Sequence, residues 1–191
     1  MVVFQTDIKL NNKTIPVIIG VILLLGFTNV SEGQSDIVEI KTFISKDGVH
    51  PGETFKVAVL VKISPGWHIH ANELSDQFLI PTELIFEENE KIEVTKFHYP
   101  EPKLEKYEYS ESELEVYDGE IILGALVKTS SELKPGKYTL KGELDYQACD
   151  NRSCLSPKKI EFEISFKGVP LSKKIEFINK NIFSKLNFEK D

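Results

Sequence analysis

The strongest constraint on the fold is a strict alternation of apolar and polar residues in short segments. In residues 54–64, TFKVAVLVKIS, every second residue from Phe55 to Ile63 is apolar, and lysines stand between some of them. Residues 158–166, KKIEFEISF, repeat the pattern with glutamates on the second face. A period of two is typical of strands that have one buried and one solvated face.

Shorter segments with strand character continue along the chain, and turn residues separate them in motifs such as SPG, YDGE and KPGK. These further strand candidates are residues 37–45, 67–71, 82–87, 92–98, 115–128 and 137–146. Many short strands without a convincing long helix predict an all-β domain, an immunoglobulin-like antiparallel β-sandwich. One such domain accounts for residues 34–167.

The amino-terminal segment predicts export from the cytoplasm. Lys9 and Lys13 precede an apolar run over residues 15–27, which is too short to span a bilayer comfortably. This order is typical of a secretory signal peptide over residues 1–33, cleaved before Gln34. The alternative is an uncleaved anchor, and both place the domain in the periplasm or outside the cell, where disulfides persist.

Two segments lie outside this strand pattern. Residues 99–116, YPEPKLEKYEYSESELEV, contain two prolines and many glutamates and predict a polar excursion from the sandwich. The tail, residues 168–191, has apolar residues at a spacing that suits a short helix on the sandwich. It is equally compatible with a frayed end.

The charge pattern excludes some classes of function. The formal net charge is −7 and the chain has no basic cluster, so we expect no nucleic-acid partner. A hydrolase is not supported either, because neither a serine nucleophile elbow nor an acid/base constellation is recognisable.

The two cysteines, Cys149 and Cys154, are separated by four polar residues. A metal site would need partners such as His68 and His70, which share a face if their segment is extended. No third signature accompanies them, so we expect neither a metal site nor any other cofactor.

A disulfide between these cysteines leaves two interpretations open. Closing so short a loop would stabilise the fold by roughly 2 kcal/mol, so a structural staple is plausible but modest in effect. The polar loop also predicts a pair near the surface, as thiol exchange requires. From the residues alone, a staple and a redox-active pair are about equally supported.

Residues 146–157, YQACDNRSCLSP, with the strands that flank them, resemble the N-terminal periplasmic domain of the thiol:disulfide interchange protein DsbD. The segment SPGWHIHA, residues 64–71, and the segment from Tyr99 onward are similar to that domain's early strand and cap region. The resemblance covers roughly residues 36–167. It implies an immunoglobulin-like domain whose cysteine pair takes part in thiol:disulfide exchange.

The resemblance also implies roles for individual residues. Cys154 matches the cysteine that forms the mixed disulfide with a partner, and Cys149 matches the one that resolves it. Tyr107 or Tyr109 would serve as the aromatic cap over the sulfurs, although the family's phenylalanine is not reproduced here. The remaining residues expected around the site are Tyr146 and Gln147.

The implied partners are a thioredoxin-like donor or a membrane electron conduit, and extracytoplasmic disulfide-bearing acceptors such as those of cytochrome c maturation. The activity would be that of a thiol:disulfide oxidoreductase of the protein-disulfide reductase type. This chain ends at Asp191 without the conduit and thioredoxin-like domain that usual members carry. The alternative function is therefore an immunoglobulin-like interaction module with a purely structural disulfide.

Overall fold

The computed structural model describes residues 36–87 and 89–188. The chain divides into two units, Met1–Gln34 and Ser35–Asp191, and the second is described here. The expected signal peptide, residues 1–33, lies outside the described residues. Among the described residues, no helix is long and apolar enough to cross a membrane.

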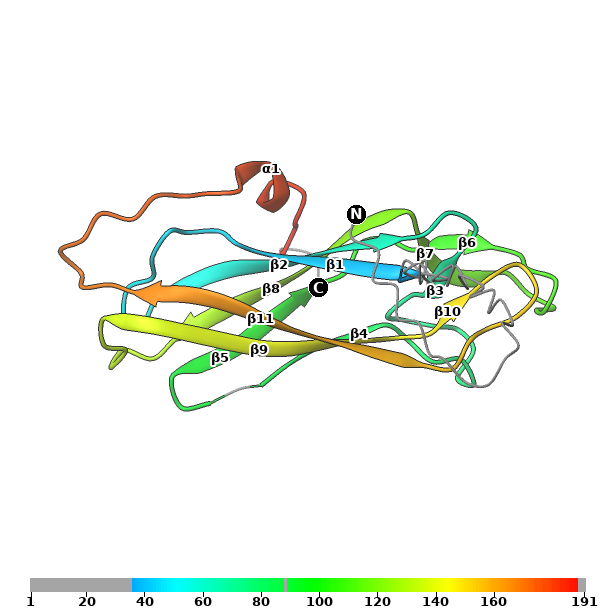
Figure 1. Ribbon diagram of the computed structural model, residues 1–191, viewed down its shortest axis with the longest axis horizontal. Coiled ribbons are helices and arrows are strands. Elements are labelled where there is room, and N and C mark those ends of the chain that lie inside the picture. The colour runs from blue at the N-terminus through cyan, green and yellow to red at the C-terminus, as the bar shows by residue number, and fades with distance from the viewer. Residues whose placement is uncertain (1–35, 88, 189–191) are drawn as a thin grey trace, which may run out of the picture. The chain divides into compact units, whose positions relative to one another are not determined.

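The described unit consists of strands with one short helix (Figure 1). The elements are β1 Val38–Ile44, β2 Thr54–Ile63, β3 His68–His70, β4 Glu83–Phe86, β5 Ile92–His98, β6 Lys103–Glu105, β7 Leu114–Asp118, β8 Glu120–Thr129, β9 Gly136–Tyr146, β10 Ala148–Cys149, β11 Lys158–Gly168 and α1 Lys180–Phe183.

These strands form three antiparallel sheets with the orders β1-β2-β8-β5, β11-β9-β4 and β10-β3-β7-β6. The first two supply the inner faces of a sandwich, and the prediction of an antiparallel β-sandwich is confirmed. The four short strands β3, β6, β7 and β10 gather at one end, as Figure 1 shows. That end carries both cysteines.

The core confirms the faces predicted from the alternation. Phe55, Val57, Val59, Val61 and Ile63 of β2 are all buried in it. Phe162, Ile164 and Phe166 of β11 are buried in the same cluster, whereas the alternate residues Glu161, Glu163 and Ser165 are exposed. The period-two signal predicted these faces because successive side chains point to opposite faces of a sheet. The second face of β2 is not fully solvated, since Ala58 is buried under the tail.

The segment 115–128, expected as one strand, is two strands in two different sheets. β7 ends at Asp118 and β8 begins at Glu120. Between them, Gly119 has a φ of 64°, a conformation that other residues adopt only at a cost. The break lets β7 leave the main sandwich and pair with β3 beside the cysteines.

The tail lies on the outer face of β2 and β8. Phe183 and Leu186 are buried there against Ala58 and Ile122, and α1 contacts β2. Asn179 anchors the start of α1 because its side chain donates a hydrogen bond to the carbonyl oxygen of Ile44, at 2.9 Å. The expected boundaries, with a signal peptide over residues 1–33, a domain over residues 34–167 and a tail over residues 168–191, remain a prediction.

Candidate functional site

The cysteine pair is held by a two-stranded contact at the end of the sandwich. In β10, Cys149 pairs with His68 of β3, and Ala148 pairs with Ile69. Cys149 and Cys154 form a disulfide, and we call residues 149–154 the cysteine loop. Directly after this loop, the main-chain N–H of Leu155 donates a hydrogen bond to the carbonyl oxygen of Ala148, at 2.9 Å. This bond closes the base of the loop.

The two sulfurs have different environments. Cys149 has no exposed surface, whereas Cys154 is partly exposed. The expectation that both lie near the surface is therefore wrong for Cys149, because β3 and its neighbours cover it. A partner can reach Cys154 far more easily than Cys149.

Asp150 organises the exposed part of the cysteine loop. Its Oδ1 accepts hydrogen bonds from the main-chain N–H groups of Arg152 and Ser153, at 2.7 and 2.8 Å. These two bonds hold the pKa of the Asp150 carboxyl below its usual value. The hydrogen bonds of the Asp150 carboxylate thus fix the turn, and Cys154 lies at the C-terminal end of that turn.

A second loop, residues 106–113, docks on the cysteine loop, and we call it the cap loop. The main-chain N–H of Glu108 donates to the carbonyl of Asn151 at 3.1 Å, and the Asn151 amide donates to Glu108 Oε1 at 2.9 Å. The Glu108 carboxylate also lies 3.9 Å from the Arg152 side chain. The two loops are joined by reciprocal bonds through Glu108 and Asn151.

The cap loop places its two tyrosines on His68. The ring of Tyr107 stacks on the His68 ring, with 3.8 Å between centroids, and Tyr109 stacks on Tyr107 at 5.6 Å. The Tyr109 hydroxyl lies 2.8 Å from His68 Nε2, within hydrogen-bond distance. Burial raises the pKa of each tyrosine to about 12, so both phenols stay protonated at neutral pH.

His68 makes the cap sensitive to acid. Burial and, less strongly, the nearby His70 lower the pKa of His68 to about 4. The unfolded chain takes up this proton near pH 6.5 and the folded chain only near pH 4, so acid favours unfolding in that window. We therefore expect the free energy of unfolding to fall by about 3 kcal/mol through His68 as the pH is lowered from 6.5 to 4.

Urea unfolding of the wild type and His68→Gln at pH 7 and pH 4.5 measures this effect. Glutamine can still bond Tyr109 but does not titrate, so the variant should lose less stability on acidification. An equal loss in both proteins would show that His68 is not buried as a neutral ring.

His70 lies against the buried sulfur. Its side chain is fully buried, and its Nε2 is 3.7 Å from Cys149 Sγ. The other nitrogen, Nδ1, is 3.1 Å from the carbonyl oxygen of Ile80. Because a carbonyl only accepts, Nδ1 carries the hydrogen. Burial also lowers the pKa of His70, so the ring is neutral and Nε2 presents a lone pair to the sulfur.

The other residues expected around the site have different positions. Gln147 supports the cysteine loop, because its amide donates to the Leu155 carbonyl at 2.9 Å. Tyr146 is buried in the core at the end of β9. Lys159, which follows the cysteine loop in the sequence, forms ion pairs with Glu143 and Asp145, at 2.8 and 2.9 Å.

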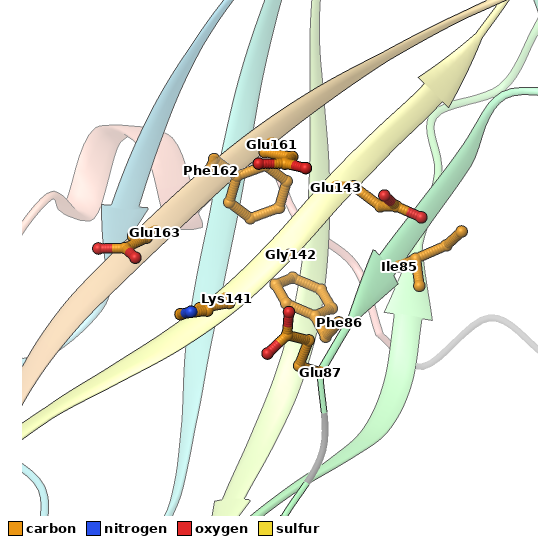
Figure 2. A pocket seen from close by; sticks show the side chains of 9 residues that line it. All are labelled: Ile85, Phe86, Glu87, Lys141, Gly142, Glu143, Glu161, Phe162 and Glu163. Carbon is orange, nitrogen blue, oxygen red and sulfur yellow. The ribbon is translucent and has the colours of Figure 1, made fainter.

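A separate hollow of about 530 Å³ lies on the sheet of β4, β9 and β11 (Figure 2). It contains neither cysteine. Figure 2 shows carboxylates around it and the rings of Phe86 and Phe162 beside Gly142. Its charged lining consists of glutamates and a single lysine, Lys141.

Comparison with known protein families shows to which family the chain belongs. The family described as "Thiol:disulfide interchange protein DsbD, N-terminal" matches residues 40–165. The chain belongs to this family. Membership of the DsbD N-terminal family confirms the immunoglobulin-like type of sandwich and the resemblance expected from the cysteine loop. The Cys149–Cys154 disulfide in such a domain fits thiol:disulfide exchange, and the family fits an extracytoplasmic location.

A solved structure agrees with this fold. The chain is similar to the N-terminal periplasmic domain of ScsB from Proteus mirabilis, with 12% identity and a TM-score of 0.50. The match covers 82% of this chain but only 57% of that one. A family 123 glycoside hydrolase from Clostridium perfringens matches at 12% identity and a TM-score of 0.32, covering 71% of this chain and 28% of that one. No curated protein sequence matches the chain.

Two features of the site were missed by sequence reasoning. The first is the contact of His70 with Cys149, and the second is the link between Glu108 and Asn151. The sequence indicated that His68 and His70 could share a strand face. The contact of His70 with Cys149 depends on the pairing of β10 with β3, which the sequence does not show. No local pattern indicated the second contact, which joins residues 43 positions apart.

Proposed function

We propose that this domain passes two electrons between extracytoplasmic proteins through the Cys149–Cys154 pair. The observation that carries the proposal is the asymmetry of the disulfide. Cys154 is partly exposed at the end of a fixed turn, and Cys149 is buried against His70. Such an arrangement suits one sulfur that meets partners and one that stays within the domain.

Reduction of the pair would begin when a donor thiolate attacks Cys154 Sγ. The bond between the two cysteines breaks, a mixed disulfide forms, and Cys149 leaves as a thiolate that takes up a proton. The second donor thiolate then attacks the donor sulfur of the mixed disulfide. The donor becomes a disulfide, and Cys154 is released.

Delivery of the electrons would follow the reverse order. The Cys154 thiolate attacks an acceptor disulfide, forms a mixed disulfide and releases one acceptor thiolate. Cys149 then attacks Cys154 Sγ, its proton passes to His70 Nε2, and the second acceptor thiolate leaves. The domain is oxidised by two electrons, and the acceptor is reduced by two.

The residues around the pair would control access to it. Tyr107 and Tyr109, which stack over His68, would shield that side of the pair from small oxidants, and a partner would dock on the cysteine loop and the cap loop to reach the partly exposed Cys154. Gln147 and the buried Tyr146 keep the strand before the cysteines in place. No cofactor is needed, because thiol exchange carries the electrons in bonds to sulfur.

The proposed setting is the periplasm or the cell exterior, reached with the signal peptide of residues 1–33. Residues 34–167 form the redox domain, and Phe183 and Leu186 of the tail, residues 168–191, stabilise its outer face. A thioredoxin-like protein or membrane conduit supplies electrons, and the acceptors include disulfide-bearing proteins such as those of cytochrome c maturation.

Reduction by a thioredoxin-like protein tests this proposal. The oxidised protein is mixed with reduced thioredoxin or with glutathione at the same thiol concentration, and free thiols are counted over time. We expect much faster reduction by thioredoxin, because a protein partner can dock on the cysteine loop and the cap loop and align its thiolate with the partly exposed Cys154. Equal rates, or resistance to thioredoxin, would contradict the proposal.

A further inference from the structure

Three potential metal ligands converge at the buried end of the disulfide. His70 Nε2, Cys149 Sγ and Cys154 Sγ all lie within 4.8 Å of one another. Within residues 36–87 and 89–188, this is the one group of three or more histidine, cysteine or acidic side chains close enough to share an ion. The sequence had favoured no metal site, because it did not show that His70 faces Cys149.

The distance between His70 and Cys149 already suits a shared ion. Nε2 and Sγ are 3.7 Å apart. A metal with a bond of about 2.3 Å to sulfur and about 2.0 Å to nitrogen holds these atoms roughly 3.5 to 3.7 Å apart in tetrahedral or trigonal geometry. Cys154 would be the third ligand. Reduction breaks the bond between the two sulfurs, so that each becomes a separate thiolate ligand.

The outer contacts of His70 are those of a metal ligand. Its Nδ1–H donates to the Ile80 carbonyl, which fixes the ring and leaves Nε2 free. Ligating histidines almost always donate their second nitrogen in this way. The main-chain carbonyl of His70 also accepts a hydrogen bond from the Thr82 hydroxyl, so both ring and strand are held.

The type of donor selects the ion. Thiolate sulfur is a soft ligand that favours Cu(I), zinc and related ions over hard cations. A closed zinc site needs four protein ligands, and only three are present in this part of the described chain.

We propose that the reduced form binds one soft, low-coordinate cation, Cu(I), through Cys149, Cys154 and His70. Binding releases the two thiol protons and involves no change in the oxidation state of the metal. The disulfide form cannot bind, because its sulfurs are not thiolates. Metal binding and thiol exchange would therefore exclude each other at this site, and Cu(I) would hold the pair reduced.

Anaerobic competition with a chromogenic Cu(I) chelator tests the proposal on the purified protein. We expect one Cu(I) per reduced chain and none at this site in the oxidised chain. His70→Asn can keep the hydrogen bond to Ile80 while removing the Nε2 ligand, and it should weaken binding by about tenfold or more. His98→Asn is the matched control, because His98 Nδ1 also bonds a main-chain carbonyl. It should change the affinity less than twofold.

Unchanged affinity in His70→Asn would overturn the role of His70, and equal binding by oxidised protein would overturn the site. X-ray absorption of the wild-type complex gives a test that needs no variant. Two sulfur ligands and one nitrogen ligand are expected, and sulfur ligands alone would contradict the proposal. A pair that exchanges with thioredoxin but binds no Cu(I) would refute this inference and leave the proposed function standing.

Discussion

Replacing Cys154 with serine is expected to reduce electron transfer to the background rate, whereas Cys149→Ser should trap the protein on its partner. In Cys154→Ser the remaining sulfur, Cys149, has no exposed surface and cannot be reached. In Cys149→Ser the accessible Cys154 can still attack a disulfide, but no second thiol releases the adduct. The two single substitutions should therefore have different products.

Non-reducing electrophoresis with a disulfide-bearing acceptor measures these products. A mixed disulfide should accumulate with Cys149→Ser and be absent with Cys154→Ser. Ser156→Ala, in an exposed position just after the cysteine loop, is the matched control and should behave as the wild type. Trapping by Cys154→Ser instead would reverse the roles assigned to the two cysteines. Trapping by neither variant would contradict the mechanism.

Gly142→Ala is expected to destabilise the fold by about 2 to 3 kcal/mol. A Cβ at Gly142 would lie 2.7 Å from the Ile85 carbonyl oxygen and 2.7 Å from Phe162 Cζ. Figure 2 shows Gly142 at the hollow between these neighbours. Relief of the contact with Ile85 requires β4 to shift away from β9, because a main-chain oxygen cannot rotate aside.

Gly124→Ala is the matched control for this effect. Its Cβ would also have a neighbour at 2.7 Å, but that atom is Cδ1 of Leu186 in the tail. The end of a leucine side chain can change rotamer, so we expect a loss below about 1 kcal/mol. Unfolding midpoints in urea compare the two variants. Equal losses would show that β4 is not held rigidly against β9.

Sequence reasoning predicted the main sandwich because burial there follows a simple period. Every second residue of β2 faces the core, so the letters alone indicate which side is dry. The turn motif YDGE, residues 117–120, indicated a reversal at Gly119, but residues 115–128 were still assigned to one strand because only one residue separates β7 from β8. Their membership of different sheets depends on long-range pairing, which a local pattern does not contain.

The candidate site was predictable in part for a similar reason. The cysteine loop could be singled out because a polar segment holds both cysteines, whereas the tyrosines at 107 and 109 were expected only from the resemblance to the DsbD N-terminal domain. The burial of Cys149 depends on β10, a strand of two residues that is too short to show any period. The contact with His70 and the docking of Glu108 then follow from the pairing of β3, β7 and β10.

The reduction potential of the Cys149–Cys154 pair tests the central claim most directly. The purified protein is equilibrated with graded thiol buffers in the absence of metal, and free thiols are counted at each ratio. The proposed function predicts a potential between about −270 and −120 mV, the span of thiol exchange proteins. A potential below about −300 mV would contradict it and would indicate a structural disulfide in an interaction module.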